Sequence, residues 1–428
     1  MNGEKLAPPR TVGFWGTSLF PLNGMIGAGI FALPAVLVAA VGNFAPWMML
    51  LGGIMFMPMA LVYAWLAGRF DHSGGPVLYG EAAFGRFVGF QAGWSRYASA
   101  IVTGAANTHV MIAYLAVVFP ALDDPTTASI AVAFVLAATT IINLLGMRGA
   151  IGTLGAMTFI KVVPLIILVL SALFAGNPAT GFALPQFSEV ETVVLLLFYA
   201  FMGFESVTEA AGEFRDPRRD APRAIVSMVL AVTVLYVAII WAYLAIGPGT
   251  GNEKNALAGT ARVALGDFGS IMIVVAAAFS IGANTFAGAT TLPRLSFGMA
   301  ERGMLPAWFM GLSKRWLTPA NSIVFGGVAS VALGLWEGFE VLAMAGTLVR
   351  LVTYVICAAA LPVLERREGM NSPFHLACAA FAVISSLWVA THADANAYLV
   401  LAGILVGGTV LYFLAARETP VTPTLAES

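Results

Sequence analysis

Charged side chains are scarce in this chain. Asp, Glu, Lys and Arg make up 10% of its 428 residues, whereas about 25% is usual for a soluble domain. Hydrophobic residues make up 59% of the sequence, and the mean hydropathy is +0.88. A soluble fold of this length could not bury so much apolar surface, so we expect an integral membrane protein. The apolar runs are continuous over about 20 residues, as in membrane-spanning helices, and they lack the alternation of barrel strands.

Cysteine and histidine are also rare. Two cysteines, Cys357 and Cys378, cannot build a disulfide framework. The four histidines are scattered without metal-ligand spacing, and there is no nucleotide-binding loop. We therefore expect no metal site, no cofactor and no ATP-driven pump, and the absence of a catalytic cluster argues against an enzyme. A net charge of −1 gives no sign of a nucleic-acid partner.

The apolar runs predict an all-α protein with twelve transmembrane helices in the lipid bilayer. We place them at residues 12–40, 44–69, 86–119, 127–147, 152–175, 190–213, 222–247, 267–300, 320–337, 339–364, 373–391 and 394–416. The segment 303–318 is too polar and too short to span, so we expect it to lie along the membrane surface. Because both polar tails are short, we expect a single domain over residues 1–428. The N-terminal sequence has no signal-peptide pattern, so we expect the first apolar run to remain as a helix.

The distribution of Lys and Arg predicts the orientation of these spans. With the N-terminus inside, the inner side carries fifteen of these residues, and the outer side carries two, Lys254 and Arg262. We therefore expect both termini to be cytoplasmic, in a multi-pass protein of the plasma membrane.

Two spans contain residues that favour a break in the helix. GMIGAGIFALP in the first span brings Gly24, Gly27 and Gly29 close together, and each glycine costs a helix about 1 kcal/mol relative to alanine. FYAFMGFES in the sixth span places Gly203 and Glu205 at mid-span. Paired breaks predict a five-plus-five inverted repeat with a midplane substrate site, where freed amides and carbonyls can bind the two ends of a zwitterion. The alternative is that GAG is only a close helix-packing surface.

The same motifs resemble those of the amino acid–polyamine–organocation (APC) transporters. The resemblance rests on GMIGAGIFALP, on FYAFMGFES with the GEFRDPRRDAPRAI after it, on SGGPVLYGEAAFG and on AERGMLP. It implies a LeuT-type fold, with broken helices 1 and 6 and with repeats over about 12–175 and 190–364, followed by two further helices over about 373–416. It also implies a transporter of amino acids or polyamines that works by proton symport or by exchange.

The resemblance further implies where the substrate binds. Its carboxylate is expected at the amides of Ala28 and Gly29, and its ammonium at carbonyls around Met25, Tyr199 and Met202. Gly288 stands where arginine–agmatine exchangers have a bulky aromatic, which predicts a wider pocket. The expected substrate contacts are Met25, Ile26, Gly27, Ala28, Gly29, Ser99, Asn107, Tyr199, Met202, Gly203 and Gly288. Gly104, on the same span as Ser99 and Asn107, is also expected to face the pocket.

Lys161 lies near mid-membrane in the fifth span, about 14 Å from its cytoplasmic end. The resemblance implies that its ammonium stands where sodium-coupled relatives bind Na⁺, bridging carbonyls of the first break to Ser280 and Asn284. Such a lysine either cycles a proton or remains charged as a fixed strut, and the alternative is a lysine that snorkels to the interface. We expect transport without Na⁺.

Three further charges lie inside predicted spans, where an ionisable group costs at least about 2.5 kcal/mol. Glu205 either has a proton-linked gating role, as the resemblance implies, or caps the second half-helix. Arg96 falls at a family gating position, where it either pairs with Glu205 or reaches the cytoplasmic interface. For Arg350 two hypotheses remain open: it faces an outer vestibule, or it pairs with Glu337 or Glu340.

The sequence thus favours a secondary transporter over a membrane enzyme or a channel-like sensor. The mixed, mostly neutral pocket favours a neutral L-amino acid as substrate. The second hypothesis is a basic amino acid or polyamine with Glu205 as counter-charge. Protons or a counter-substrate are the expected coupling partners, while oligomeric state and an accessory subunit stay open.

Overall fold

A computed structural model describes residues 12–70, 74–146, 151–175, 177, 183–209, 211, 214–247, 249 and 253–418. Within these ranges the chain is helical, apart from connecting segments and one isolated parallel bridge between Val12 and Phe214. The first eleven and last ten residues, with Arg148, lie outside the described part. The expected sides of both termini and of Lys5, Arg10 and Arg148 therefore stay predictions.

The first half of the chain forms seven α-helices. They are α1 (Phe14–Met25), α2 (Gly29–Val41), α3 (Ala45–Ala67), α4 (Pro76–Phe84), α5 (Arg86–Leu115), α6 (Pro125–Leu144) and α7 (Ile151–Ala175). Two 3₁₀ turns, η1 (Gly42–Phe44) and η2 (Pro120–Asp123), precede α3 and α6. Of these helices, α4 was not predicted as a separate element.

The second half begins with another interrupted helix. Its α-helices are α8 (Phe187–Phe201), α9 (Ser206–Glu209), α10 (Pro217–Ile246), α11 (Ala256–Glu301), α12 (Ala320–Trp336), α13 (Phe339–Arg367), α14 (Pro373–Ala390) and α15 (Ala395–Ala415). The 3₁₀ turns η4 (Glu253–Asn255) and η5 (Ala307–Met310) flank α11. Of segment 303–318, only η5 is helical, in agreement with the prediction that this segment does not span.

Nine helical segments among the described residues are long and apolar enough to cross a membrane. The helix α5 is not among them because Asn107 and His109 lower its hydropathy, and α12 has only 17 residues. The structure thus gives an all-helical, multi-pass membrane protein. The count of twelve spans stays a prediction.

The two largest differences from the predicted helix starts each have a local cause. Helix α11 begins at Ala256 rather than at 267, because a kink at Gly266 (φ 66°) joins a short helical segment to the predicted span. Helix α10 begins at Pro217 rather than at 222. Proline suits the first helical position, and the Asp216 side chain accepts a hydrogen bond from the Arg219 amide at 3.3 Å.

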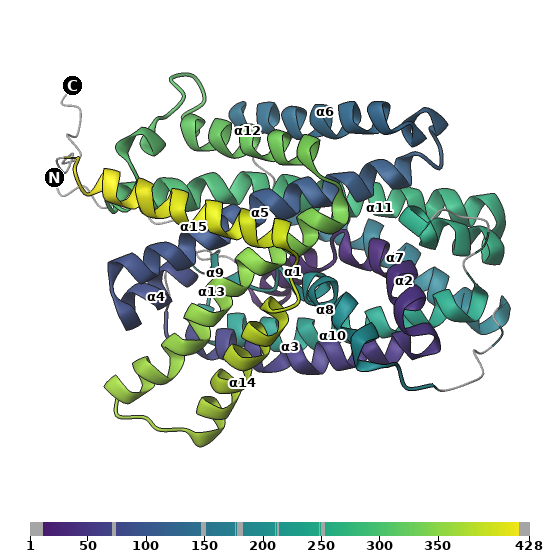
Figure 1. Ribbon diagram of the computed structural model, residues 1–428, viewed down its shortest axis with the longest axis horizontal. Helices are drawn as coiled ribbons and strands as arrows, with labels where there is room; N and C mark the ends of the chain where they lie inside the picture. Colours follow the sequence, from purple (N-terminus) through teal and green to yellow (C-terminus); the bar gives the residue numbers. More distant parts are fainter. Residues whose placement is uncertain are drawn as a thin grey trace.

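The two interrupted helices lie at the centre of the molecule (Figure 1). Helix α1 packs against α9, α10 and α7, while α2 packs against α8 and α11, so each half-helix meets a half of the other pair. Helix α5 runs through the middle and contacts α13 and α11. Helices α6 and α12 lie side by side along one edge, and α14 lies toward the opposite edge (Figure 1).

The two interruptions touch through backbone atoms. A Cβ added to Gly24 would lie 2.2 Å from the carbonyl oxygen of Gly203, and one added to Gly203 would lie 2.3 Å from that of Gly24. Gly203 also has φ +109°, a conformation that other residues rarely adopt. On the next turn, a Cβ on Gly29 would lie 2.9 Å from the Cα of Ala200. The glycines therefore permit the two broken helices to cross in direct contact.

Candidate functional site

The first interruption covers Ile26–Ala28, between α1 and α2. Ile26 leaves helical geometry with ψ 80°, and the Gly27 amide donates to the Met25 carbonyl at 2.8 Å. Carbonyls at the end of a helix have no partner within it, and here several receive side-chain donors from other helices. Tyr236 of α10 donates to the Met25 carbonyl at 2.8 Å. The interruption is thus a polar centre inside an apolar core.

Lys161 of α7 points its ammonium at this centre. Its side chain is fully buried, and Nζ donates to the carbonyl oxygens of Ile26 at 3.0 Å and Asn23 at 3.3 Å. Ser280 of α11 donates to the same Ile26 oxygen at 2.9 Å. Full burial and the two α1 carbonyl partners disfavour a lysine that snorkels to the interface, while its role as proton carrier or fixed strut stays a prediction.

A chain of polar side chains joins both interruptions. Asn284 of α11 donates to the carbonyls of Asn23 and Gly24 at 3.0 and 2.9 Å. Its own carbonyl oxygen accepts from Asn107 of α5 at 3.1 Å, and the Tyr199 hydroxyl of α8 donates to Asn107. Through these contacts α11 and α5 bridge α1 to α8, next to the places where both helices stop.

The second interruption covers residues 202–205, between α8 and α9. The Met202 amide donates back to the Tyr199 carbonyl at 3.3 Å, and the Ser206 amide donates to that of Gly203 at 3.2 Å. Ser206 also donates through Oγ to the Phe20 carbonyl of α1 at 3.0 Å. A single turn of helix, Ser206–Glu209, follows.

Glu205 is fully buried at this second interruption. One carboxylate oxygen accepts from the Gly203 amide at 3.0 Å and from the Tyr354 hydroxyl at 3.2 Å. The other accepts from the guanidinium of Arg350, and Arg96 Nε lies 3.5 Å away from it. Glu205 therefore binds a freed backbone amide and also forms ion pairs with two other helices, while its expected roles in gating and in capping the second half-helix stay predictions.

Arg350 and Arg96 are both buried, with 4% and 6% exposure. Arg350 of α13 pairs with Glu205, so the hypothesis of a pair with Glu337 or Glu340 is wrong, whereas the outer vestibule stays a prediction. Arg96 of α5 reaches two carboxylates, with Nε 2.7 Å from Glu209 as well as 3.5 Å from Glu205. The expected pairing with Glu205 is thus present, and the alternative role at the cytoplasmic interface stays a prediction.

Ser99 was expected to face substrate, but it is fully buried beneath Arg350. Its hydroxyl accepts from Arg350 Nε at 2.8 Å and donates to the Gly346 carbonyl at 2.8 Å. In the structure Ser99 thus positions the guanidinium. An expected contact with substrate is replaced by a contact with a charged side chain.

The other expected contacts lie around the crossing of the two broken helices. Ala28 is the N-cap of α2 and Gly29 is its first residue, and this helix N-terminus has no side-chain cap. Tyr199 and Met202 are buried at the end of α8, each with 7% exposure. Gly288 is half-buried, and a Cβ added there would meet nothing within 4 Å, which agrees with open space at that position.

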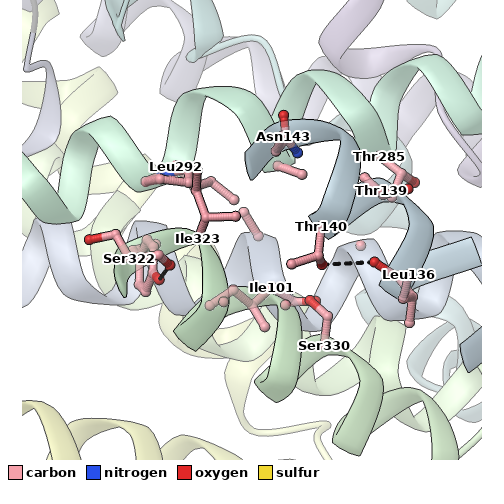
Figure 2. A pocket seen from close by; sticks show the side chains of 17 residues that line it. Ile101, Leu136, Thr139, Thr140, Asn143, Thr285, Leu292, Ser322, Ile323 and Ser330 are labelled. Atoms are coloured by element: carbon pink, nitrogen blue, oxygen red, sulfur yellow. Dashed lines mark hydrogen bonds between the residues drawn. The ribbon is translucent and has the colours of Figure 1, made fainter. Parts of the chain in front are cut away.

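A separate pocket lies away from the interruptions, between α5, α6, α11 and α12 (Figure 2). Its lining includes Thr139, Thr140 and Asn143 of α6, with Thr285 of α11 and Gly104 of α5. Adjacent residues of α11 thus face different surroundings, because Asn284 contacts the α1 carbonyls whereas Thr285 faces this pocket. Of the residues expected to face the substrate, Gly104 lines it.

Two tyrosines at the site were missed by the sequence analysis. Tyr236 and Tyr354 are fully buried, and their hydroxyls contact Met25 and Glu205. The available signal was a tyrosine inside each of two apolar spans, since buried tyrosine hydroxyls need a partner. The sequence therefore indicates that each hydroxyl needs a hydrogen-bond partner, but it does not indicate which residue that partner is.

Comparison with known proteins gives the family. A family model described as amino acid permease matches residues 12–416. The chain belongs to the amino acid permease family. This confirms the resemblance to APC transporters, and the fold and relatives identify the permease-family chain as a membrane transporter.

Curated relatives of this permease-family chain are themselves transporters. An uncharacterized transporter of Mycobacterium bovis is 29% identical over 401 residues, which cover 84% of this chain and 81% of that protein. One from Mycobacterium tuberculosis is 29% identical over 400 residues with the same coverage. The cadaverine/lysine antiporter of Escherichia coli is 26% identical over 327 residues, covering 74% of this chain and 68% of that protein.

Proposed function

We propose that this protein is a Na⁺-independent secondary active transporter for a neutral L-amino acid in the plasma membrane. The observation that carries the proposal is the crossing of two interrupted helices at Gly24 and Gly203, with Lys161 bonded to the first interruption. In this proposal twelve spans form a single domain with a five-plus-five inverted repeat, and both termini are cytoplasmic. No metal or cofactor takes part.

The substrate is a zwitterion held by the ends of the half-helices. Its carboxylate binds the uncapped amides of Ala28 and Gly29, where the positive end of the α2 dipole also favours an anion. Its ammonium binds carbonyls around Met25, Tyr199 and Met202. The Met25 carbonyl already accepts from Tyr236 and from the Gly27 amide, so a substrate ammonium shares this oxygen with them.

Lys161 supports independence from Na⁺. Its ammonium already donates to the carbonyls of Asn23 and Ile26, and a cation bound to the same oxygens would meet a like charge. Proton coupling and exchange against a counter-substrate are two versions of the proposal. In either one, coupling requires that the second ligand changes the relative stability of the inward-open and outward-open states.

A basic amino acid or polyamine is the second candidate substrate. The relative named a cadaverine/lysine antiporter supports it. Against it stands the pairing of Glu205 with Arg350, because a carboxylate that already has a guanidinium partner offers little to a second cation. The neutral substrate is therefore the better-supported proposal.

The test is uptake by purified protein in proteoliposomes without Na⁺. Labelled neutral amino acids, lysine and cadaverine are compared at two external pH values, with vesicles either empty or loaded with unlabelled substrate. The proposal predicts uptake of a neutral amino acid, through exchange if loaded vesicles are needed and through symport if an inward proton gradient drives uptake into empty vesicles. A requirement for Na⁺ at fixed pH and osmolarity, or uptake of the cationic substrates alone, would contradict it.

A further inference from the structure

Arg350 forms a buried ion pair at the very edge of the candidate substrate site. Its guanidinium bonds to Glu205, and the other oxygen of that carboxylate lies 3.0 Å from the Gly203 amide. Gly203 is itself in contact with Gly24 at the crossing of the broken helices. The ion pair of Arg350 and Glu205 is thus linked, through Gly203, to the place where the two interruptions meet.

The guanidinium is held in this position by its surroundings. The Ser99 hydroxyl accepts a hydrogen bond from its Nε at 2.8 Å and donates one to the Gly346 carbonyl at 2.8 Å. Because Ser99 lies on α5 and Gly346 on α13, both helices fix the orientation of Arg350. A hydrogen-bonded and buried guanidinium of this kind cannot swing away without leaving polar groups unsatisfied.

The charges around the interruptions also balance in a specific way. Among the described residues, three buried cations lie there, Lys161, Arg96 and Arg350, and they face two carboxylates, Glu205 and Glu209. The four residues other than Lys161 form a network of zero net charge. With Arg350 in place, no negative charge of this network is left for a cationic substrate group.

We infer that Arg350 is a specificity-determining residue that acts as a built-in counter-cation for Glu205 and thereby excludes cationic amines from the site. This inference rests on the proposed function and specifies its substrate class. The guanidinium occupies the position that the second ammonium of a diamine, or the side-chain ammonium of a basic amino acid, would take against Glu205. Removing it leaves a buried carboxylate beside the interruption, which a cationic substrate then satisfies.

The network offers variants that separate position from charge. Arg350→Gln removes the ion-pair partner of Glu205. Arg96→Gln also removes one positive charge, but it mainly takes the partner from Glu209, the carboxylate nearer to Arg96. Arg350→Lys retains the charge, and the double variant Glu205→Gln with Arg350→Gln removes both charges together. Arg262→Gln is the control for arginine loss, because its ion pair with Asp267 is exposed and such pairs contribute little.

The experiment is inhibition of neutral amino acid uptake by lysine and by cadaverine in proteoliposomes. For Arg350→Gln, the concentration of cadaverine or lysine that halves uptake should fall at least about tenfold relative to wild type, a difference of about 1.4 kcal/mol in binding. Arg350→Lys, Arg96→Gln, Arg262→Gln and the double variant should stay within about twofold of wild type, inside ordinary context variation. No gain in Arg350→Gln, or an equal gain in Arg96→Gln, would overturn the inference.

Folding is followed through the thermal midpoint of each purified variant in detergent, with and without the two amines. If Arg350→Gln does not fold, Glu205→Gln decides the question, because it leaves Arg350 without its anion. The inference then predicts stronger inhibition by glutamate than in wild type, and no change would contradict it. Uptake by the wild type tests the proposed function, whereas the difference between wild type and variants tests the role of Arg350.

Discussion

The ammonium of Lys161 and the carbonyl oxygen of Ile26 lie 3.0 Å apart, at the point where α1 stops being helical. Ser280 donates to the same oxygen. Lys161→Met should abolish uptake, because no cation then stabilises the freed carbonyls of Asn23 and Ile26. Ser280 and Asn284 remain as donors to the Ile26 and Asn23 carbonyls, so each carbonyl loses one hydrogen bond worth about 0.5–1.5 kcal/mol, and the thermal midpoint should fall as well.

Ser280→Ala is the matched control for this change, since Lys161 remains as a donor to Ile26. It should retain most uptake in the Na⁺-free assay. Wild-type uptake by Lys161→Met would show that the ammonium is dispensable for both folding and transport.

The contact between Gly24 and Gly203 gives a second prediction. Gly24→Ala should lower the thermal midpoint and the yield of folded protein, because the new Cβ would lie 2.2 Å from a backbone oxygen that cannot rotate away. Overpacking of this kind typically costs about 1–3 kcal/mol. Gly403→Ala on α15 is the control, as its Cβ would meet nothing within 4 Å. Equal stability of both variants would argue against the direct crossing.

The positions of the two interruptions could be predicted from the sequence, because glycine lowers the helix propensity of the segment that contains it. Gly24, Gly27 and Gly29 lie within a few residues of one another, and Gly203 precedes a carboxylate inside an apolar span. The packing around them follows a different rule. It depends on which helices meet in space, and hydropathy alone carries no such information.

Arg350 shows this limit most clearly. It lies 145 residues from Glu205 in the sequence, and acidic residues much nearer in sequence, Glu337 and Glu340, offered an equally reasonable partner. Ser99 was predicted to face substrate for a related reason: a buried serine has the same local sequence whether it contacts a ligand or a guanidinium. Only the packing of α13 on α5 distinguishes these cases.

The link between Asn284, Asn107 and Tyr199 gives a third prediction. Asn284→Ala should impair both stability and substrate affinity more than Tyr199→Phe. The first change removes donors from the carbonyls of Asn23 and Gly24 and an acceptor from Asn107. The second removes only the hydroxyl that donates to Asn107.

Substrate-dependent thermal stabilisation and the KM for uptake measure the two effects separately. The expected order is wild type, then Tyr199→Phe, then Asn284→Ala, with each lost buried hydrogen bond contributing about 0.5–1.5 kcal/mol. The reverse order would show that the Tyr199 hydroxyl of α8 contributes more than the hydrogen bonds of Asn284 to the first interruption.

The last prediction concerns Arg69, which lies just after the C-terminal end of α3. Its guanidinium contacts two carboxylates that differ in burial. Its Nη2 lies 2.8 Å from the carboxylate of Glu365, whose side chain is 5% exposed. Its Nε lies 3.2 Å from the carboxylate of Glu368, whose side chain is 45% exposed. Glu365 also bonds to His375 at 2.6 Å, and His375 stacks on Trp65. Glu365 is therefore a three-helix junction of α3, α13 and α14.

Glu365→Gln and Glu368→Gln remove one carboxylate charge each from the same arginine, so their comparison isolates burial. Exposed pairs contribute about 0–1 kcal/mol, whereas loss of one partner from a buried pair leaves an uncompensated charge and costs several times more. The thermal midpoint in detergent should therefore fall clearly for Glu365→Gln and remain close to wild type for Glu368→Gln. Because this junction lies outside the candidate substrate site, the KM of folded Glu365→Gln protein should stay near the wild-type value, and a changed KM would connect the junction to the transport cycle.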